Sequence, residues 1–195
     1  MEGPRGYDFQ PKYTEEELMV RRRARAAAAA AAPPVQPPPG PDPVPAPNRM
    51  GNNDWCECGS CVPMPSVIQC RCCHEVDNCD RFLDARITCI VRHEDLQKVC
   101  MERVVLRTAL VARLDSRGHR RNLPEVLDNI SYRYAAYRLF TYWVHGYLGK
   151  GVRRVIPACA VTRIREAFPE PDGNYIGFKE GDDGDDIPVP EEFLI

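Results

Sequence analysis

Cysteine clustering constrains this chain more than any other feature. Eight of its ten cysteines fall between Cys56 and Cys89, in the string WCECGSCVPMPSVIQCRCCHEVDNCDRFLDARITC. Thiols at this density form either a disulfide framework or a metal cage, and the two belong to different compartments. A reduced cluster without metal is a third alternative, but such a cluster is hard to stabilise.

The N-terminal sequence favours the metal cage. Residues 1–20 read MEGPRGYDFQPKYTEEELMV, with several acidic residues and no apolar core of signal-peptide length. No stretch of the sequence has the roughly 18 apolar residues that a membrane-spanning helix needs. We therefore expect an intracellular protein, cytoplasmic rather than nuclear, in which the thiols stay reduced and bind zinc.

The cysteine spacing suits tetrahedral zinc. Cys58 and Cys61 are separated by two residues, so their sulfur atoms can reach one ion at about 2.3 Å. Cys72 and Cys73 are adjacent and point in different directions, which suits two ions better than one. One zinc needs four thiolates, two separate zincs need about eight, and two that share bridging thiolates need about six. The sequence spacing alone leaves the number of ions open.

Four other residues have two interpretations each. His74 and His93 are close enough in sequence to replace a thiolate, or they are ordinary surface histidines. Cys100 lies in a helical stretch, where a buried apolar thiol is the usual case. Cys159 lies seventy residues after the cluster. It is either a lone core thiol or a remote ligand that joins a C-terminal helix to the metal.

Composition divides the chain into three parts. The chain has 195 residues and a formal net charge of −2, which fits one domain with tails. Residues 1–50 contain an alanine tract and a proline-rich stretch with little apolar surface, so we predict a disordered arm with a transient helix in TEEELMVRRRARAAAAAAA. Residues 51–179 form the folded domain, and residues 180–195 form a flexible acidic tail.

Apolar periodicity predicts a mainly α fold. We expect helices over about 94–114, 124–147 and 156–168, because apolar residues recur there at three- and four-residue spacing. No sustained alternation predicts strands. The expected architecture is a small helical domain organised around the cysteine-rich cluster.

Several sequence blocks resemble a known family. WCECGSC, the adjacent cysteine pair, ITCIV, YRYAAYRLF, VIPACAVTRIREAFP and GNYIGFK occur in this order. Together they resemble the cytoplasmic C-terminal (ballast) domain of the P2X purinoceptor 7 family, a pattern that also occurs in free-standing animal proteins without the channel. The resemblance covers about residues 50–179. The N-terminal arm has no counterpart in it.

The resemblance implies a helical fold built on a dinuclear zinc cluster. Carried over position by position, the ligands are Cys58, Cys61, Cys72, Cys73, Cys89 and Cys159. Six thiolates complete two tetrahedral ions only if two of them bridge. Cys56 matches a lipid-anchoring position of the family, and Cys70 and Cys79 have no clear counterpart.

The same resemblance implies a guanine-nucleotide site. Its matching positions are Arg133, Tyr137 and Ile156. The first two lie one helical turn apart, where a guanidinium and an aromatic ring share one face. Two basic positions of the family are Glu170 and Val161 here, and an acid beside a di- or triphosphate repels it. The candidate substitute cations are Arg153, Arg154 and Arg163. Alternatively, Arg133 and Tyr137 only pack and pair within the chain.

The sequence contains no catalytic constellation. It lacks a phosphate-binding GxxxxGK[ST] loop and a nucleophile motif with a partnered histidine. Zinc saturated by thiolates has no open position for activating water. We expect a non-catalytic regulatory or interaction module with a protein partner. The alternative is a zinc-dependent nucleic-acid-binding protein, which the RRRAR run favours and the net charge of −2 disfavours.

Overall fold

The computed structural model describes residues 13–31, 42–116, 124, 126–148 and 152–178. The chain forms two compact units, Met1–Pro39 and Gly40–Ile195. The described residues contain α-helices and short 3₁₀ turns but no strand, so the predicted mainly α class is confirmed. The predicted acidic tail over 180–195 lies outside the described residues.

The first unit contains helix α1, Glu15–Ala31. Thr14 and Glu17 form a capping box, in which the Glu17 N–H donates to the Thr14 hydroxyl and the Thr14 N–H donates to the Glu17 carboxylate. The described side chains of α1 are all exposed. The helix therefore rests on its cap and on the high helix propensity of alanine, at the place where the arm is predicted to form a transient helix.

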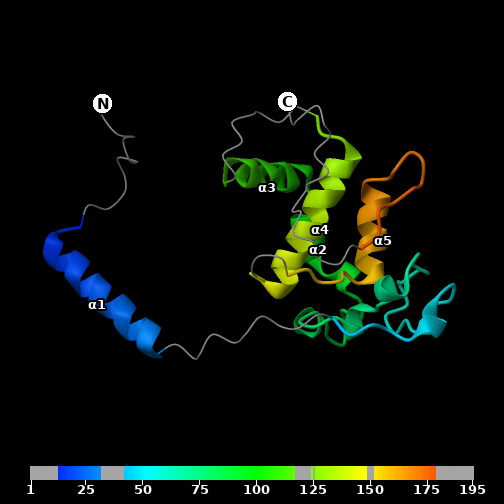
Figure 1. Ribbon diagram of the computed structural model, residues 1–195, viewed down its shortest axis with the longest axis horizontal. Helices are drawn as coiled ribbons and strands as arrows, with labels where there is room; N and C mark the ends of the chain where they lie inside the picture. Colours follow the sequence, from blue (N-terminus) through cyan, green and yellow to red (C-terminus); the bar gives the residue numbers. More distant parts are fainter. Residues whose placement is uncertain (1–12, 32–41, 117–123, 125, 149–151, 179–195) are drawn as a thin grey trace. The chain divides into compact units, whose positions relative to one another are not determined.

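In the part of the second unit that the structure describes, the α-helices are α2 to α5 (Figure 1). Their bounds are α2 (Glu94–Cys100), α3 (Arg103–Ser116), α4 (Asn129–His145) and α5 (Ala158–Ala167). Helix α4 packs against α2, α3 and α5. The core includes Leu96, Leu106, Phe140, Ile164 and Phe168, each at most 2% exposed.

The single helix predicted over 94–114 is wrong. The chain leaves helical geometry between Cys100 and Arg103, which separates α2 from α3. Leu106 follows Leu96 by ten residues, so in one straight helix the two side chains would point about 80° apart. The break lets both helices turn their apolar residues toward α4.

The other two predicted helices are shorter than expected. Helix α4 begins at Asn129 rather than 124, because the Asp128 carboxylate accepts the Ser131 N–H at 2.7 Å and caps the helix. It ends before Gly146, whose φ of 70° a residue with a side chain rarely adopts. Helix α5 occupies Ala158–Ala167 within the predicted 156–168.

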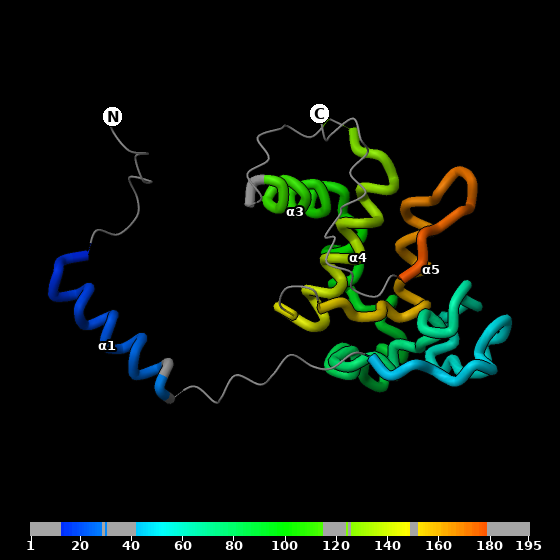
Figure 2. Tube along the Cα trace, in the orientation of Figure 1, coloured from blue at the N-terminus to red at the C-terminus, as the bar shows by residue number. Residues whose placement is uncertain are grey.

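The cysteine-rich segment contains only short 3₁₀ turns. Within it lie η2 (Val67–Gln69), η3 (Cys73–Glu75) and η4 (Asp80–Phe82), and it is flanked by η1 (Pro47–Arg49) and η5 (Ile90–Arg92). Figure 2 shows this cyan-to-green segment folded beside the start of α5, which η3 and η5 contact. Because the segment has few backbone hydrogen bonds of regular secondary structure, its order depends on side-chain interactions.

Residues 42–50, which the sequence assigns to the arm, lie in the second unit. The Asp42 carboxylate accepts the Arg154 guanidinium at 2.7 Å and the Val155 N–H at 2.9 Å, and it lies 3.7 Å from Arg71. These buried contacts tie the segment to the domain. Among the described residues, no helix is both long and apolar enough to cross a membrane.

Candidate metal centre

Seven cysteine sulfur atoms gather in two sets of four that share Cys58. The first set contains Cys56, Cys58, Cys61 and Cys72; the second contains Cys58, Cys73, Cys89 and Cys159. Within each set all sulfur atoms lie within 4.8 Å of one another. Six of the seven side chains are buried, and Cys56 is half-buried. The arrangement offers two adjacent four-sulfur sites.

The sulfur separations match a tetrahedral zinc site. Two thiolates bound at about 2.3 Å to one tetrahedral ion lie about 3.8 Å apart. The Cys56 and Cys58 sulfur atoms are 3.8 Å apart, and those of Cys58 and Cys61 are 3.7 Å apart. A disulfide needs about 2.05 Å, and none of the cysteines is bonded to another. The donor set therefore fits zinc.

A tight turn positions the first pair of thiols. Gly59 has a φ of 71°, which reverses the chain between Cys58 and Cys61 at little steric cost. The Ser60 N–H points at the Cys58 sulfur. The same relationship recurs between Cys72 and the His74 N–H, and between Cys89 and the Val91 N–H. Each N–H stabilises a thiolate two residues before it.

A carboxylate fixes the backbone at Cys72. The Cys72 N–H donates to Glu75 at 2.9 Å, and Arg49 holds both Glu75 oxygens, at 2.7 and 2.9 Å. The Arg49 guanidinium also donates to the Cys70 carbonyl at 3.0 Å. These hydrogen bonds orient the segment that carries Cys72 and Cys73, as groups hydrogen-bonded to metal ligands do in known metal sites.

Helix α5 brings Cys159 to the cluster. Cys159 is the second residue of α5, 2% exposed, at the helix end whose dipole favours an anion. The Ala158 N–H donates to the Arg71 carbonyl at 2.9 Å, which joins the helix to the loop. Cys89 immediately precedes η5, which packs on α5.

The crowded thiols cannot all ionise without a cation. The pKa of Cys58 is lowered to about 7, first by contact with the Cys159 thiol and then by the Ser60 N–H. The pKa of Cys89 is lowered to about 2, chiefly by the Cys159 and Cys73 thiols. The pKa of Cys159 is strongly raised, because thiolates surround it. A bound dication would remove this conflict.

The structure brings together all six cysteines that the family resemblance implies, and it adds Cys56. The C-x-C spacing of Cys56 and Cys58 was the sequence signal that could have placed Cys56, the seventh cysteine, in the cluster. Cys70, Cys79 and Cys100 are buried outside both sets. The Cys70 thiol donates to the Ser66 carbonyl at 3.4 Å, and burial raises the pKa of Cys79 and of Cys100 to about 12.

Neither candidate histidine belongs to a four-sulfur set. The His74 ring is exposed, and its Nε2 lies 2.8 Å from the Thr88 carbonyl, although the ring also lies near Cys72 and Cys73. The His93 ring accepts the Asp95 N–H at 3.2 Å and so caps α2. Both rings have intrachain roles that require no metal.

The nucleotide positions lie on a different part of the domain. Arg133 is buried on α4, donates to the Phe168 carbonyl at 2.7 Å and forms a close ion pair with Glu170. The Tyr175 ring lies 5.3 Å from the Arg133 guanidinium, and the Tyr175 hydroxyl accepts the Glu170 N–H at 3.1 Å. Arg133 is therefore already neutralised by a carboxylate of its own chain.

The remaining nucleotide positions are only partly exposed. Burial raises the pKa of Tyr137, although a hydrogen bond from Arg165 acts in the opposite direction and lowers it. Arg165 also stacks on the Tyr175 ring at 4.4 Å. Ile156 packs half-buried against the core in the segment before α5, and Val161 is buried within α5. Arg133, Tyr137, Arg165 and Tyr175 thus form one arginine–tyrosine cluster, with Ile156 on a separate segment.

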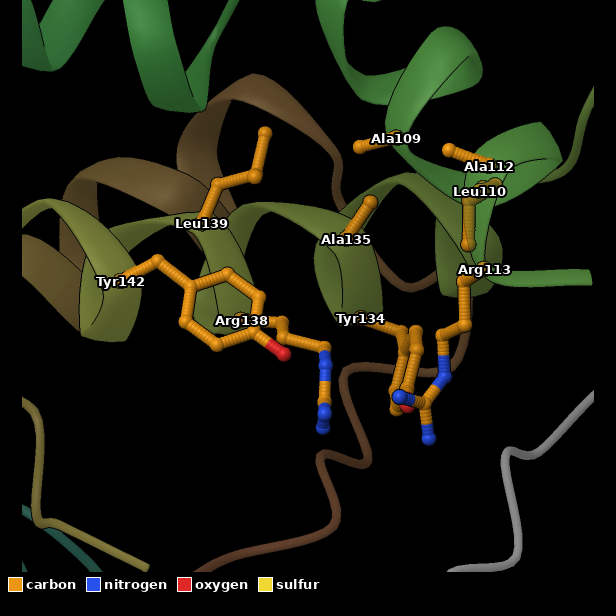
Figure 3. A pocket seen from close by; sticks show the side chains of 9 residues that line it. All are labelled: Ala109, Leu110, Ala112, Arg113, Tyr134, Ala135, Arg138, Leu139 and Tyr142. Atoms are coloured by element: carbon orange, nitrogen blue, oxygen red, sulfur yellow. The ribbon is translucent and has the colours of Figure 1, made fainter. Parts of the chain in front are cut away.

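A groove of about 340 Å³ lies between α3 and α4, helices that contribute none of the seven thiols. Figure 3 shows Ala109, Leu110, Ala112 and Arg113 on one side and Tyr134, Ala135, Arg138, Leu139 and Tyr142 on the other. The Arg138 guanidinium lies 5.2 Å from the Tyr142 ring. The groove is mostly apolar, with arginine side chains at its edge.

Comparisons with known proteins agree with the resemblance. The profile of the P2X purinoreceptor 7 intracellular domain family matches residues 14–179, which includes α1 and so extends further toward the N-terminus than the resemblance suggested. P2X purinoceptor 7 of Mus musculus is 31% identical over 134 residues, 69% of this chain and 21% of the receptor. P2X purinoceptor 7 of Rattus norvegicus is 28% identical over 133 residues, 68% of this chain and 21% of the receptor.

The chain thus spans about a fifth of the length of the curated relatives that it matches. The family match covers most of the chain and all of the cysteine sites. The chain belongs to the P2X purinoreceptor 7 intracellular domain family.

Proposed function

We propose that this protein is a non-catalytic, zinc-binding regulatory or interaction module that holds two zinc ions. The observation that supports the proposal is the pair of four-sulfur sets, whose sulfur atoms lie within 4.8 Å of one another in each set, with two separations of 3.7 and 3.8 Å in the first set. Soft thiolates in tetrahedral sets select zinc over harder cations. Four sulfur ligands leave no open position for water, so the role of the metal is structural.

Zinc bound here would join two distant parts of the chain. The loop carries Cys58, Cys61, Cys72, Cys73 and Cys89, and α5 carries Cys159. Because the loop contains only short 3₁₀ turns, the metal would supply much of its folding free energy. The module would then present its helical surface only in the zinc-loaded state.

Metal analysis of the purified chain tests this proposal. We expect about two zinc ions per chain, and removal by a strong chelator should unfold the loop and lower the melting temperature. A preparation with one zinc or none after growth in zinc-supplemented medium would contradict the dinuclear site. Cys70→Ser is a matched control, because its thiol donates to the Ser66 carbonyl at 3.4 Å and a serine hydroxyl can do the same.

Guanine nucleotide is our second candidate ligand, at the arginine–tyrosine cluster. The Arg133 and Arg165 guanidiniums beside the Tyr175 ring favour it. The Glu170 carboxylate disfavours it, because a phosphate would have to displace Glu170 from Arg133. Calorimetry with GDP and GTP tests the idea, and no heat of binding at millimolar ligand would exclude it.

An intracellular location follows from the same proposal. Reduced thiols are needed for the zinc sites, and the matching family is described as an intracellular domain. We expect the cytoplasm rather than the nucleus, and a protein partner. Two arginines that a nucleic-acid surface would use have partners within the chain: Arg154 pairs with Asp42 and Arg163 with Glu166. Binding to DNA or RNA that weakens steeply with salt would favour the alternative function.

A further inference from the structure

We propose that the acidic segment 179–195 of this chain binds in the groove between α3 and α4 of its own domain. The proposal concerns an interaction surface and does not rest on zinc binding, because α3 and α4 contribute none of the seven thiols. The family profile ends at residue 179, so the segment lies beyond the part of the chain that matches the family.

The groove is apolar surface that the described part of the domain leaves uncovered. Helix α3 packs against α2 and α4, and of its residues in the groove Ala112 is exposed and Ala109 is half-buried. On the α4 side, Leu139 is half-buried and Tyr142 is exposed. Val111, beside Ala112, is exposed as well. Apolar side chains that covered this surface would gain free energy by leaving water.

The charged residues of the groove are basic. Arg113 and Arg138 are its only charged lining residues, and Figure 3 shows both side chains extending to the same side of α4. The Arg138 guanidinium lies 5.2 Å from the Tyr142 ring, and the Arg113 guanidinium lies 5.7 Å from the Tyr134 ring. Among the described residues, no carboxylate pairs with Arg138. A ligand that fits this groove therefore combines apolar side chains with negative charge.

The segment 179–195 has this complementary chemistry. It contains seven carboxylates between Glu180 and Glu192, and carboxylates form strong charge-assisted hydrogen bonds with guanidiniums. Pro188 and Pro190 restrict its backbone, which lowers the conformational entropy that binding would cost. Its apolar residues are Ile187, Val189, Phe193, Leu194 and Ile195.

The segment is long enough to reach the groove. The chain is held close to its start, because a methyl carbon at Gly177 would lie 2.9 Å from Oε1 of the buried Gln69. Seventeen residues follow Phe178, and an extended chain of this length spans up to about 55–60 Å. A domain of this size has a radius of gyration of about 15 Å. Because the segment belongs to the same chain, its effective concentration at the groove is about millimolar.

Other cations of the domain are less suitable partners. Arg133 already pairs with Glu170, and Arg154 pairs with Asp42, so the segment would have to displace an existing carboxylate from either. The exposed arginines of α1 are the main alternative, and the experiment therefore includes them.

A glutamate-specific protease tests the proposal on the full chain. Cleavage after Glu192 releases a peptide that mass spectrometry quantifies, and binding in the groove should slow its release. Ala112→Glu places a carboxylate in the groove, and Arg138→Glu reverses its charge. We expect release about tenfold faster in each variant, because burial of one large apolar side chain shifts the equilibrium by at least about this factor. An unchanged rate in both variants would overturn the proposal.

Matched substitutions on α1 serve as controls. Ala24→Glu and Arg22→Glu make the same changes at exposed positions of α1 and should leave the release rate unchanged. Faster release in Arg22→Glu alone would assign the segment to α1 instead of the groove and overturn the proposal. Unchanged melting temperatures of the groove variants would show that the domain itself remains folded.

Photo-crosslinking identifies the occupant independently of these variants. Benzoylphenylalanine in place of Phe193 keeps an aromatic side chain and reacts with the residues that it contacts. Crosslinks to α3 or α4 within one chain would support the proposal. Crosslinks that join two chains would assign the groove to a second copy, and crosslinks only to α1 would exclude the groove; either result would contradict the proposal.

Discussion

The Ala158 N–H donates to the Arg71 carbonyl at 2.9 Å, and each of these residues directly precedes a cysteine of the cluster. Cys159 follows Ala158 at the start of α5, and Cys72 follows Arg71 in the loop. One backbone hydrogen bond thus aligns the two segments whose thiols must meet. Metal bound at the two proposed sites would support the same junction between loop and helix as this bond does.

Replacing Cys159 tests that junction. Cys159→Ser removes one sulfur from the second set while leaving the Ala158 hydrogen bond available. Loss of a group that only hydrogen-bonds to a metal ligand typically weakens metal binding about 10–100-fold, so loss of a ligand should weaken it at least about tenfold. Competition with a chromophoric chelator would measure this change. Wild-type zinc retention in Cys159→Ser would show that α5 does not contribute a ligand.

The Asp42 carboxylate should be essential for stability. It lies between Arg154 and Arg71, and the three side chains are only 4–9% exposed. Asp42→Asn leaves two buried guanidiniums without their carboxylate, and we expect a loss of about 3–5 kcal/mol in the free energy of unfolding. Urea unfolding of the zinc-loaded protein measures this change in the free energy of unfolding. Asp54→Asn is the control, because Asp54 is exposed and should change stability by less than about 0.5 kcal/mol.

Local patterns predicted the parts of the fold that depend on local interactions. The periodicity of α4 and α5 located both helices, although Asp128 and Gly146 set boundaries inside the predicted range for α4. The break between α2 and α3 was not predicted, because it serves packing against α4 rather than any local propensity. Asp42 also carried no local signal, since both of its arginine partners are distant in sequence.

In the candidate site, too, local sequence patterns predicted some residues, whereas others depend on contacts between distant parts of the chain. The C-x-x-C spacing indicated Cys58 and Cys61 directly, whereas Cys159 entered only through the family resemblance. Cys56 was assigned a lipid-anchoring role through the family resemblance, and its place beside Cys58 emerges only from the three-dimensional turn. The Glu170 pairing with Arg133 likewise depends on how the segment after α5 returns to α4.

Removing the Glu170 charge should favour nucleotide binding. Glu170→Gln leaves the Arg133 guanidinium without its carboxylate, and it removes a negative charge beside the place where phosphates would bind. We expect about tenfold tighter GDP binding, ~1.4 kcal/mol, by calorimetry. Glu166→Gln is the control, because Glu166 is exposed and pairs with Arg163 at 3.3 Å. Unchanged or weaker GDP binding in Glu170→Gln would argue that the arginine–tyrosine cluster is purely structural.

The Glu75 carboxylate should control how tightly the loop holds metal. It accepts the Cys72 N–H at 2.9 Å and is held by Arg49 at 2.7 Å, so it fixes the backbone that carries Cys72 and Cys73. Glu75→Gln keeps the side-chain shape but loses the ion pair with Arg49. We expect zinc affinity to fall about tenfold, the lower end of the effect of removing a group that orients metal ligands, because the thiolates themselves remain.

Chelator competition would compare Glu75→Gln with Glu57→Gln. The Glu57 carboxylate is 73% exposed and lies 3.9 Å from the His74 ring, so it does not hold the loop backbone. A drop in zinc affinity that is confined to Glu75→Gln would indicate that the orientation of the Cys72 segment governs zinc affinity. An equal drop in both variants would instead indicate that affinity depends on the total negative charge near the cluster, since each substitution removes one carboxylate.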